Sequence, residues 1–374
     1  MQSSNGKLLQ RPRMESEQGV GGRLKPAQTD QTEPIVGIGL PVFNGERYLA
    51  QTIDSILAQT FENFELVICD NASTDRTQEI AEGYALRDAR VRYYRNDRNL
   101  GAGPNYDLCF YRSRGEYFKW AAHDDLLAPD FIAQCVTLLD RNPDAVMSAV
   151  GVTHIDSEGR VLRVETFPCS CLASPSPAAR FTTTLLNRHG CASCVNFFGV
   201  FRRVALLTSQ LHGNYGHSDS VLLAEMALRG PSVIVPAPLF FDRDHPGRLT
   251  NKGTSPTDMV GWWDQSKTGK REPYILIAYT NLWRLALAAP LPLAERLRAI
   301  SGLISWWTVR HNFRSAIDQS LWCIAPRVHS LITTLRHKSR QTRQLRESRA
   351  ALARSAASNE CVADQMDHSA HSKV

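Results

Sequence analysis

The chain has 374 residues, of which 43% are hydrophobic and 21% charged, enough to bury at least one sizeable core. A formal net charge of +6 is mild for this length and does not favour nucleic-acid binding. No apolar run approaches the roughly 20 residues that span a bilayer, and residues 1–22 lack a signal-peptide core. Nine cysteines without an extracellular signature predict free thiols. The expected location is the cytoplasm, with peripheral attachment at the inner membrane surface left open.

The first half of the chain predicts an α/β fold. Residues 1–33 are polar and aperiodic, which predicts a disordered segment. Apolar runs then predict strands, each followed by helical periodicity, at 35–41, 64–70, 91–94, 117–121 and 145–148. Strands that alternate with helices in this way indicate repeated βαβ units, hence a Rossmann-like, mostly parallel sheet flanked by helices.

Acidic residues follow two of the predicted strands. Asp70 closes the strand 64–70, and Asp124-Asp125 comes just after 117–121. Ligands of a parallel α/β sheet bind at the carboxyl ends of its strands. A carboxylate pair there suits Mg²⁺ or Mn²⁺ together with a diphosphate, because these cations prefer oxygen ligands. Further along, Asp219 begins a helical pattern that closes on Gly230, a suitable position for a catalytic base.

The second half is less regular. From 151 to 255 we expect short strands and turns, and from 256 to 340 a helical, basic extension that carries several tryptophans. Residues 341–374 form a polar tail that we expect to be disordered. Between Arg296 and Arg354 there are twelve Lys or Arg residues against two acidic ones. This region could lie on an anionic membrane surface, or its apolar residues could be core; both remain open.

The cysteines of the middle region offer one further alternative. Cys169, Cys171, Cys191 and Cys194 could form a four-thiolate zinc site, although the C-x-C half has an atypical spacing. Separate thiols are the default expectation.

Five elements, in order, resemble the inverting family 2 glycosyltransferases of the GT-A fold. They are Pro41-Val42-Phe43-Asn44, the run from Cys69 to Asp75, Asn99-Leu100-Gly101, Asp124-Asp125 with Pro129 downstream, and Ser218-Asp219 before Arg229-Gly230. Singly they are weak, but their order and spacing over roughly 215 residues are specific. The resemblance implies a GT-A-like fold with a nucleotide-sugar-binding half at 34–150. It also implies an acceptor-side half at 151–255 that carries the base.

The resemblance also implies roles for individual residues. Pro41, Phe43 and Asp70 would line the nucleobase pocket, where Asp70 accepts a hydrogen bond from a uracil-type imide. Asp124 would hold the metal, and Asp219 would be the base. The remaining substrate-side candidates are Asn44, Asn99, Arg243 and Arg248, with His245 as a second metal or phosphate ligand.

Two positions depart from the family pattern. The first Asp of the family, usually a ribose contact, falls on Ala122, and His123 and Asp125 are the candidates to compensate. Ser218 stands where many relatives have Glu. Each carboxylate also has a purely structural explanation, as a helix cap or a turn residue.

Together these features predict a metal-dependent, inverting, hexosyltransferase-type enzyme. It would move a sugar from a nucleotide-diphosphate donor, a UDP-sugar, to a hydroxyl of a glycan or lipid-linked acceptor in polysaccharide or glycolipid assembly. The alternative is a catalytically impaired nucleotide-sugar-binding protein or partner subunit. A nucleotidyltransferase would need a glycine-rich triphosphate loop, but the run from Gly37 to Leu40 is the predicted strand itself. A nucleic-acid binder would leave the βαβ half without a role.

Overall fold

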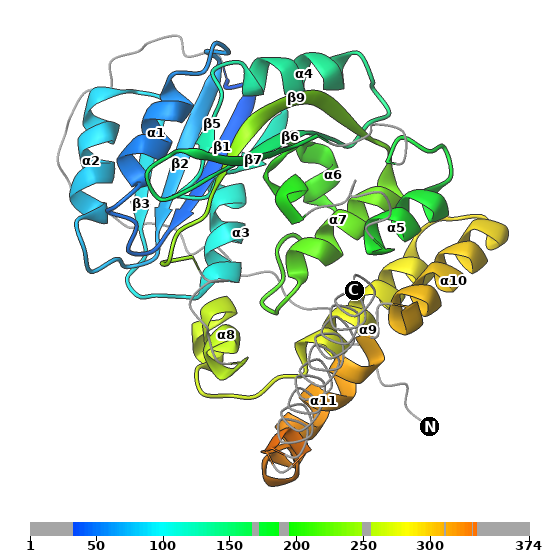
Figure 1. Ribbon diagram of the computed structural model, residues 1–374. Helices are drawn as coiled ribbons and strands as arrows, with labels where there is room; N and C mark the ends of the chain where they lie inside the picture. The colour runs from blue at the N-terminus through cyan, green and yellow to red at the C-terminus, as the bar shows by residue number, and fades with distance from the viewer. Residues whose placement is uncertain are drawn as a thin grey trace, which may run out of the picture. The chain divides into compact units, whose positions relative to one another are not determined.

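The structure is a computed structural model that describes residues 33–166, 172–186, 194–248, 256–309, 312–330 and 332–334. Its first part alternates strands and helices as predicted (Figure 1). These elements are β1 (Val36–Val42), α1 (Leu49–Leu57), β2 (Phe64–Asp70), α2 (Thr77–Arg87), β3 (Val91–Arg95), α3 (Ala102–Arg112), β4 (Tyr117–Trp120), β5 (Leu126–Leu127) and α4 (Phe131–Asp140).

The remaining elements continue the sheet and then become helical. They are β6 (Met147–Ile155), β7 (Val161–Glu165), α5 (Pro177–Leu186), the 3-10 helix η2 (Cys194–Phe198), β8 (Val200–Arg202), α6 (Arg203–Leu207), α7 (Ser218–Arg229), β9 (Ser232–Arg243), α8 (Pro256–Trp263), the 3-10 helix η3 (Gln265–Lys267), α9 (Tyr274–Ala288), α10 (Leu293–Val309) and α11 (Asn312–Ile324).

The described strands form one nine-stranded sheet in the order β3-β2-β1-β4-β8-β6-β9-β5, with β7 paired to β6. The strands β3, β2, β1 and β4 are parallel, as predicted. The strand β8 is antiparallel to both β4 and β6, and β6 is parallel to β9. The α/β fold with flanking helices and a helical C-terminal extension is therefore confirmed.

The long strand β9 was not evident from the sequence. Pro236 and Pro238 interrupt its pattern, and proline cannot donate a ladder hydrogen bond. A register shift between Val150 and Val152 of β6 accommodates this irregular stretch. The segment with the least regular sequence thus joins the same sheet as β1 to β4, and the boundary that we predicted at residue 150 falls within β6.

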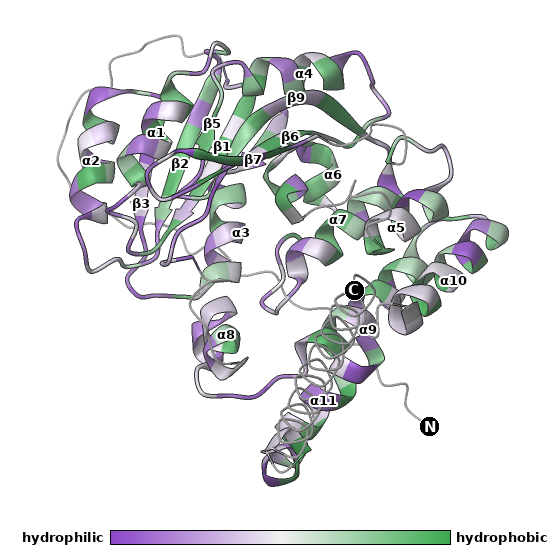
Figure 2. Ribbon diagram, in the orientation of Figure 1, coloured by the Kyte–Doolittle hydropathy of each residue, from purple (hydrophilic) through white to green (hydrophobic). Residues whose placement is uncertain are grey.

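Helices cover both faces of the sheet. Alternate residues of β1 and β2, such as Ile38 and Leu66, pack with α1, α2 and α4 in one buried cluster. The other face carries Cys69, Trp120 and their neighbours, packed against α3, α6 and α7. Strand side chains alternate between faces, so two buried faces require near-continuous apolar strands. Figure 2 shows the strands as predominantly hydrophobic.

Glycine allows α3 to approach the sheet closely. A Cβ on Gly39 would lie 2.6 Å from Cys109 Cβ and 2.9 Å from Phe118 Cζ. Only glycine fits such a contact without a backbone shift. This packing positions the N-terminal end of α3, and the loop before it, beside the carboxyl ends of β1 and β2.

The C-terminal helices pack on α5 and α7. Residues of α5, α7, α9 and α10, including Phe181, Ala224, Leu282 and Leu303, form a third buried cluster. In the part of the chain that the structure describes, no helix is both long and apolar enough to cross a membrane.

Candidate active site

Asp70 ends β2 at the carboxyl edge of the sheet, as predicted, and its side chain is fully buried. Its Oδ1 accepts the Ser73 N–H at 2.8 Å, and its Oδ2 accepts from Tyr93 OH at 2.7 Å and Arg95 Nη1 at 2.6 Å. A buried carboxylate with three donors is strongly held. Asp70 is thus fixed at the strand end, and a ligand imide would have to share or replace one of these bonds.

The loop after β1 presents Phe43 and Asn44 at the same edge. Pro41 is buried within β1, whereas the Phe43 side chain is 43% exposed, unusual for an aromatic ring beside a strand end. Asn44 adopts a left-handed conformation, with a φ of 52°. Its N–H donates to Ser73 Oγ at 2.9 Å, and its Oδ1 accepts the Thr74 N–H at 2.8 Å. Asn44 therefore ties two substrate-side loops together and leaves Phe43 as the accessible ring.

A buried asparagine network supports the next loop. Asn99 Oδ1 accepts from Asn71 Nδ2 and from the Gly101 N–H, both at 2.8 Å. Asn71 Oδ1 accepts the Leu100 N–H at 2.9 Å. The network orders the loop before α3, and it orients Asn99 toward the protein. Sequence analysis did not single out Asn71, although it lies in the matched run after Asp70.

Asp124 lies beside His245, two residues that are distant in sequence. Asp124 Oδ2 and His245 Nε2 are 2.9 Å apart. Burial opposes ionisation of Asp124, but the nearby His123 and the hydrogen bond with His245 outweigh it and lower the pKa of Asp124 to about 2. The structure thus brings together the two predicted metal ligands and keeps the carboxylate ionised.

His123 lies against the loop after β1. A Cβ on Gly45 would be 2.8 Å from His123 Cδ2. His123, the candidate to compensate for Ala122, therefore lies beside the loop that carries Asn44 and Gly45; its contact with substrate remains a prediction.

Asp125 turns away from its neighbour. Its Oδ1 accepts the Arg243 N–H at 2.8 Å, and its side chain is buried. Burial, together with Asp124 and Asp242, raises the pKa of Asp125 well above its usual range. In this arrangement Asp125 joins its loop to the end of β9, and its predicted contact with substrate remains a prediction.

Arg243 and Arg248 have protein partners at the end of β9. Arg243 is 2% exposed, donates from Nε to the Asp124 carbonyl at 2.8 Å, and lies over the Tyr48 ring. Arg248 forms a bidentate pair with Asp242 at 2.8 and 3.0 Å. Arg248 is one-third exposed and can reach an anion; Arg243 braces the Asp124 loop.

Asp219 lies in the first turn of α7, as predicted, and is partly exposed. The preceding His217 has a φ of 67°, which turns the chain sharply into the helix. Asp219 Oδ1 accepts the Ser220 N–H at 2.7 Å. The helix dipole favours a carboxylate at this end.

An aromatic stack lies directly behind Asp219. The rings of Tyr106 and His212 stack at 4.7 Å between centroids, and His212 stacks on Trp263 at 4.9 Å. Ser218 Oγ and His212 Nδ1 are 3.2 Å apart. Burial lowers the pKa of His212 to about 4, so the ring is neutral at neutral pH. Ser218 therefore has a defined partner in this chain.

Tyr106 links the end of β4 to the start of α7. The Tyr106 carbonyl accepts from Trp120 Nε1 at 3.0 Å, and its ring stacks on His212, which contacts Ser218. Burial raises the pKa of the Tyr106 hydroxyl, and the carboxylates of Asp124, Asp125 and Asp219 act in the same direction. Sequence analysis missed Tyr106, His212 and Trp263, because nothing in their spacing distinguishes them from core aromatics.

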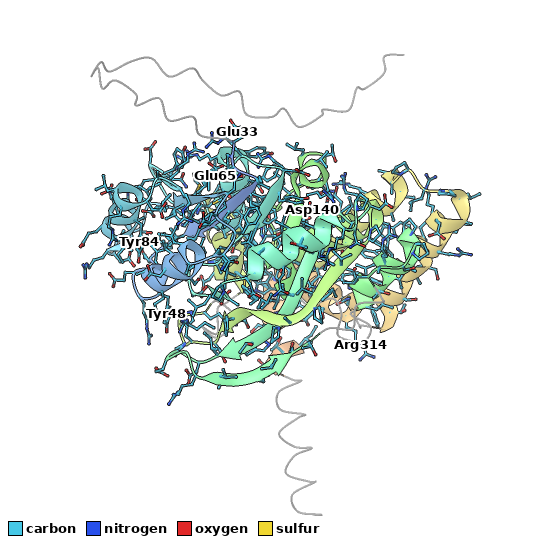
Figure 3. All side chains as sticks on the ribbon, turned by 90° about the horizontal axis from the view of Figure 1, so that it is seen from above. Glu33, Tyr48, Glu65, Tyr84, Asp140 and Arg314 are labelled. Atoms are coloured by element: carbon cyan, nitrogen blue, oxygen red, sulfur yellow. The ribbon has the colours of Figure 1, made fainter. Side chains whose placement is uncertain are left out.

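The donor atoms present fit a divalent cation in part. Asp124 supplies an ionised oxygen ligand, and Mg²⁺ or Mn²⁺ commonly takes one or two carboxylates plus substrate phosphates. The ring of Tyr48, labelled in Figure 3, packs against the ring of His245 with 4.9 Å between centroids. The Tyr48 hydroxyl is buried, and it has no hydrogen-bond partner among the described residues. However, the Gly247 N–H points at His245 Nδ1 at 3.2 Å, which favours the tautomer whose Nε2–H donates to Asp124. Asp124 fits a metal as it stands; His245 would have to change tautomer.

A cluster of three or more metal-ligating side chains is absent from the described residues. The suggested four-cysteine zinc site lies outside them, since Cys169, Cys171 and Cys191 and the Cys194 side chain are not described.

Residues 38–208 match the family profile "Glycosyl transferase family 2". An uncharacterized glycosyltransferase of Rickettsia typhi is 36% identical over 131 residues, which cover 34% of this chain and 40% of that protein. The putative glycosyltransferase EpsE of Bacillus subtilis is 32% identical over 127 residues, covering 34% of this chain and 46% of EpsE. The chain thus spans less than half the length of these curated relatives.

Among solved structures, the crystal structure of S. aureus TarS 1-349 in complex with UDP-GlcNAc aligns with a TM-score of 0.55 at 16% identity. The alignment covers 79% of this chain and 82% of that chain. A likeness at this identity concerns the fold.

Proposed function

We propose, from the match of residues 38–208 to the profile of glycosyl transferase family 2, that the protein transfers a sugar from a nucleotide-sugar donor to an acceptor hydroxyl with inversion. The observation that carries the proposal is the chain of contacts between the two acidic stretches: Trp120, before Asp124, donates to the Tyr106 carbonyl, Tyr106 stacks on His212, and His212 contacts Ser218, beside Asp219. In this proposal Asp124 acts on the side of the leaving diphosphate, and Asp219 acts on the acceptor hydroxyl.

Asp219 is the general base of this scheme. Its carboxylate takes the proton of the acceptor hydroxyl while that oxygen attacks the anomeric carbon on the face opposite the diphosphate. The new glycosidic C–O bond forms as the bond to the diphosphate breaks, and the diphosphate leaves with the electron pair. A single displacement of this kind inverts the anomeric centre and needs only one base.

Asp124 and its neighbours form the donor side. Asp124 would hold Mg²⁺ or Mn²⁺, with His245 as second ligand after a change of tautomer, and the cation would neutralise the charge of the leaving diphosphate. Arg248 lies in the same loop and can pair with a phosphate oxygen. Phe43 offers an accessible ring for the nucleobase, and Asp70 a fixed carboxylate at the strand end.

The donor that we propose is a UDP-sugar. The crystallised TarS, which shares the fold, is in complex with UDP in one structure and with UDP-GlcNAc in another. A carboxylate at the position of Asp70 suits the imide N–H of uracil. For the acceptor we propose a glycan or lipid-linked sugar in polysaccharide or glycolipid assembly.

Donor binding gives the first test. Thermal shift with UDP, UDP-GlcNAc, UDP-glucose and GDP-mannose, each with and without Mn²⁺, should show stabilisation by a uridine nucleotide that increases with the metal. Asp124→Asn should abolish the metal-dependent part, whereas Asp144→Asn, an exposed aspartate in the turn before β6, should not. If no nucleotide stabilises the wild type under any of these conditions, the donor site is refuted.

Catalysis gives the second test, on the same samples. Asp219→Asn should retain the donor-induced shift and reduce release of UDP in the presence of glycan and lipid-extract acceptors by about 10²–10⁴-fold. Undiminished turnover in Asp219→Asn would show that another group is the base.

The alternative function is a catalytically impaired nucleotide-sugar-binding subunit. It is motivated by Ala122, which stands where the family has an acidic ribose ligand, and by Ser218, which bonds His212 instead of presenting a carboxylate. Donor binding without turnover, equal in wild type and Asp219→Asn, would favour it.

A further inference from the structure

The helices α9 to α11 carry many of the exposed large apolar side chains found in the described residues. They and the short helical stretch after α11, residues 326–330, expose Leu276, Leu287, Leu293, Leu297, Ile304, Ile317, Ile324 and Val328. The core of this region is a different face, where Ala278, Leu282, Ala299 and Leu303 pack together. The exposed side chains are therefore separate from the buried core that these helices share.

On α11 the exposed Ile317 and Ile324 share one apolar stripe with two half-buried residues, Phe313 and Leu321. The four recur at intervals of three and four residues, which places them on one side of the helix. Ile317 is 56% exposed and Ile324 is 84% exposed. Figure 2 shows hydrophobic and hydrophilic residues side by side along this helix.

The opposite side of α11 is occupied by the protein. Ala316 is 3% exposed, and Gln319 Oε1 accepts the Ile275 N–H of α9 at 3.0 Å. The Trp322 carbonyl accepts from Arg271 Nη1 at 2.9 Å. These contacts fix the rotation of α11 about its axis, so its apolar stripe faces outward.

The charges around the stripe are predominantly basic. Arg314 follows Phe313 and is exposed, as seen in Figure 3, and Arg327 is exposed beside Val328. The acid on α11, Asp318, lies 3.1 Å from His329 Nε2. The sequence from Arg296 to Arg354 has twelve basic residues against two acidic ones. A second copy of this chain would bring the same positive charge, so charge complementarity favours an anionic partner.

We propose that α11 docks on an anionic phospholipid bilayer, lying in the plane of its surface. The stripe of Ile317, Leu321 and Ile324 enters the boundary between headgroups and acyl chains, and Arg314 and Arg327 lie at the phosphates. An apolar stripe with a basic flank is the composition that such surfaces bind. The inference goes beyond sugar transfer and stands whether or not the chain is catalytically active.

The experiment is vesicle cosedimentation of the full chain, with phosphatidylcholine vesicles and with equimolar phosphatidylglycerol and phosphatidylcholine. We expect binding to the anionic vesicles that weakens with added salt. The double variant Ile317→Ser/Ile324→Ser should lower the partition coefficient by roughly tenfold or more, because it removes most of the exposed aliphatic area. Arg314→Glu should lower it by roughly tenfold on the anionic vesicles only.

Matched variants elsewhere should leave binding unchanged. Leu86→Ser replaces an 88% exposed leucine on α2, and Arg141→Glu reverses an exposed charge at the end of α4. Unchanged thermal midpoints show that all variants fold. Absence of vesicle binding, or equal binding of all variants, would overturn the proposal. So would a wild-type dimer in sedimentation velocity that Ile317→Ser/Ile324→Ser dissociates, since a second copy would then occupy the stripe.

Discussion

At the residue scale, Lys119 is the most unusual buried group outside the candidate site. It lies in β4 with no exposed surface, donates to the Phe198 carbonyl, and has its ammonium 4.5 Å from the Phe131 ring centroid. Burial lowers the pKa of Lys119 to about 7, although Cys135 and Asp125 raise it slightly. The Lys119 side chain is long enough to reach the Phe198 carbonyl, but the protein interior disfavours its positive charge.

This pKa predicts a specific pH dependence. In the unfolded chain Lys119 has its ordinary pKa of 10.5, whereas in the folded chain its pKa is about 7. Between these values the unfolded state binds more protons, so wild-type stability rises with pH by up to about 1.4 kcal/mol per unit. Lys119→Met lacks this dependence.

Chemical denaturation of both proteins at pH 7.5 and 9.5 provides the measurement. The stability of Lys119→Met relative to wild type should decrease as pH rises. A difference that is constant with pH would mean that Lys119 stays charged in the folded protein.

At the scale of elements, the loop before α3 and the segment after α8 hold each other in place. The Gln265 N–H donates to the Leu100 carbonyl at 3.2 Å, and Trp263 stacks on His212 behind the candidate base. Gly101 has a φ of 93°, and a Cβ there would lie 2.7 Å from the Trp263 carbonyl oxygen and from Asp264 Cα. The loop before α3 and the residues at the end of α8 are thus linked by a backbone hydrogen bond and by the close packing of Gly101.

Gly101→Ala should therefore lower the free energy of unfolding by more than the strained backbone conformation alone would. Alanine in the Gly101 conformation, with a φ of 93° and a ψ of 167°, costs about 1–3 kcal/mol, and the clash with backbone atoms adds about 1–3 kcal/mol. Gly269 supplies the matched control, because its φ is 75° and, in the part of the chain described, a Cβ would meet nothing within 4 Å. Denaturant titration of Gly101→Ala and Gly269→Ala measures the difference. Equal losses would show that the contact with Trp263 and Asp264 is unimportant.

At the scale of the whole molecule, one sheet joins the two functional halves. The short strand β8 pairs with β4 on one side and β6 on the other, and it comes from residues 200–202, beyond the predicted boundary at 150. A segment that ended at residue 150 would leave β4 with an open edge and β6 cut short. We therefore expect the two halves to unfold together.

Hydrogen exchange read by mass spectrometry tests this cooperativity. Amides of β1 and β2 should open with the same free energy as those of β6 and β9, because both require loss of the shared sheet. A clearly lower opening free energy for β6 and β9 would show that the acceptor-side half is a separate folding unit.

The sequence by itself determined the strands 35–41, 64–70, 91–94 and 117–121 and the acids that follow them. Its information is local, since apolar periodicity and strand ends are properties of neighbouring residues. It also indicated the family through ordered motifs, and it placed Asp219 at the start of a helix. The roles of these acids remain predictions, for which the structure supplies positions.

The tertiary structure decided what depends on contacts distant in sequence. It placed His245 on Asp124, turned Asp125 toward β9 and Asn99 toward Asn71, and stacked His212 between Tyr106 and Trp263. It also added β9 to the sheet despite two prolines, and it set the rotation of α11 that leaves its apolar stripe exposed. Such pairings arise from packing between elements, and periodicity along one element carries no information about its partner.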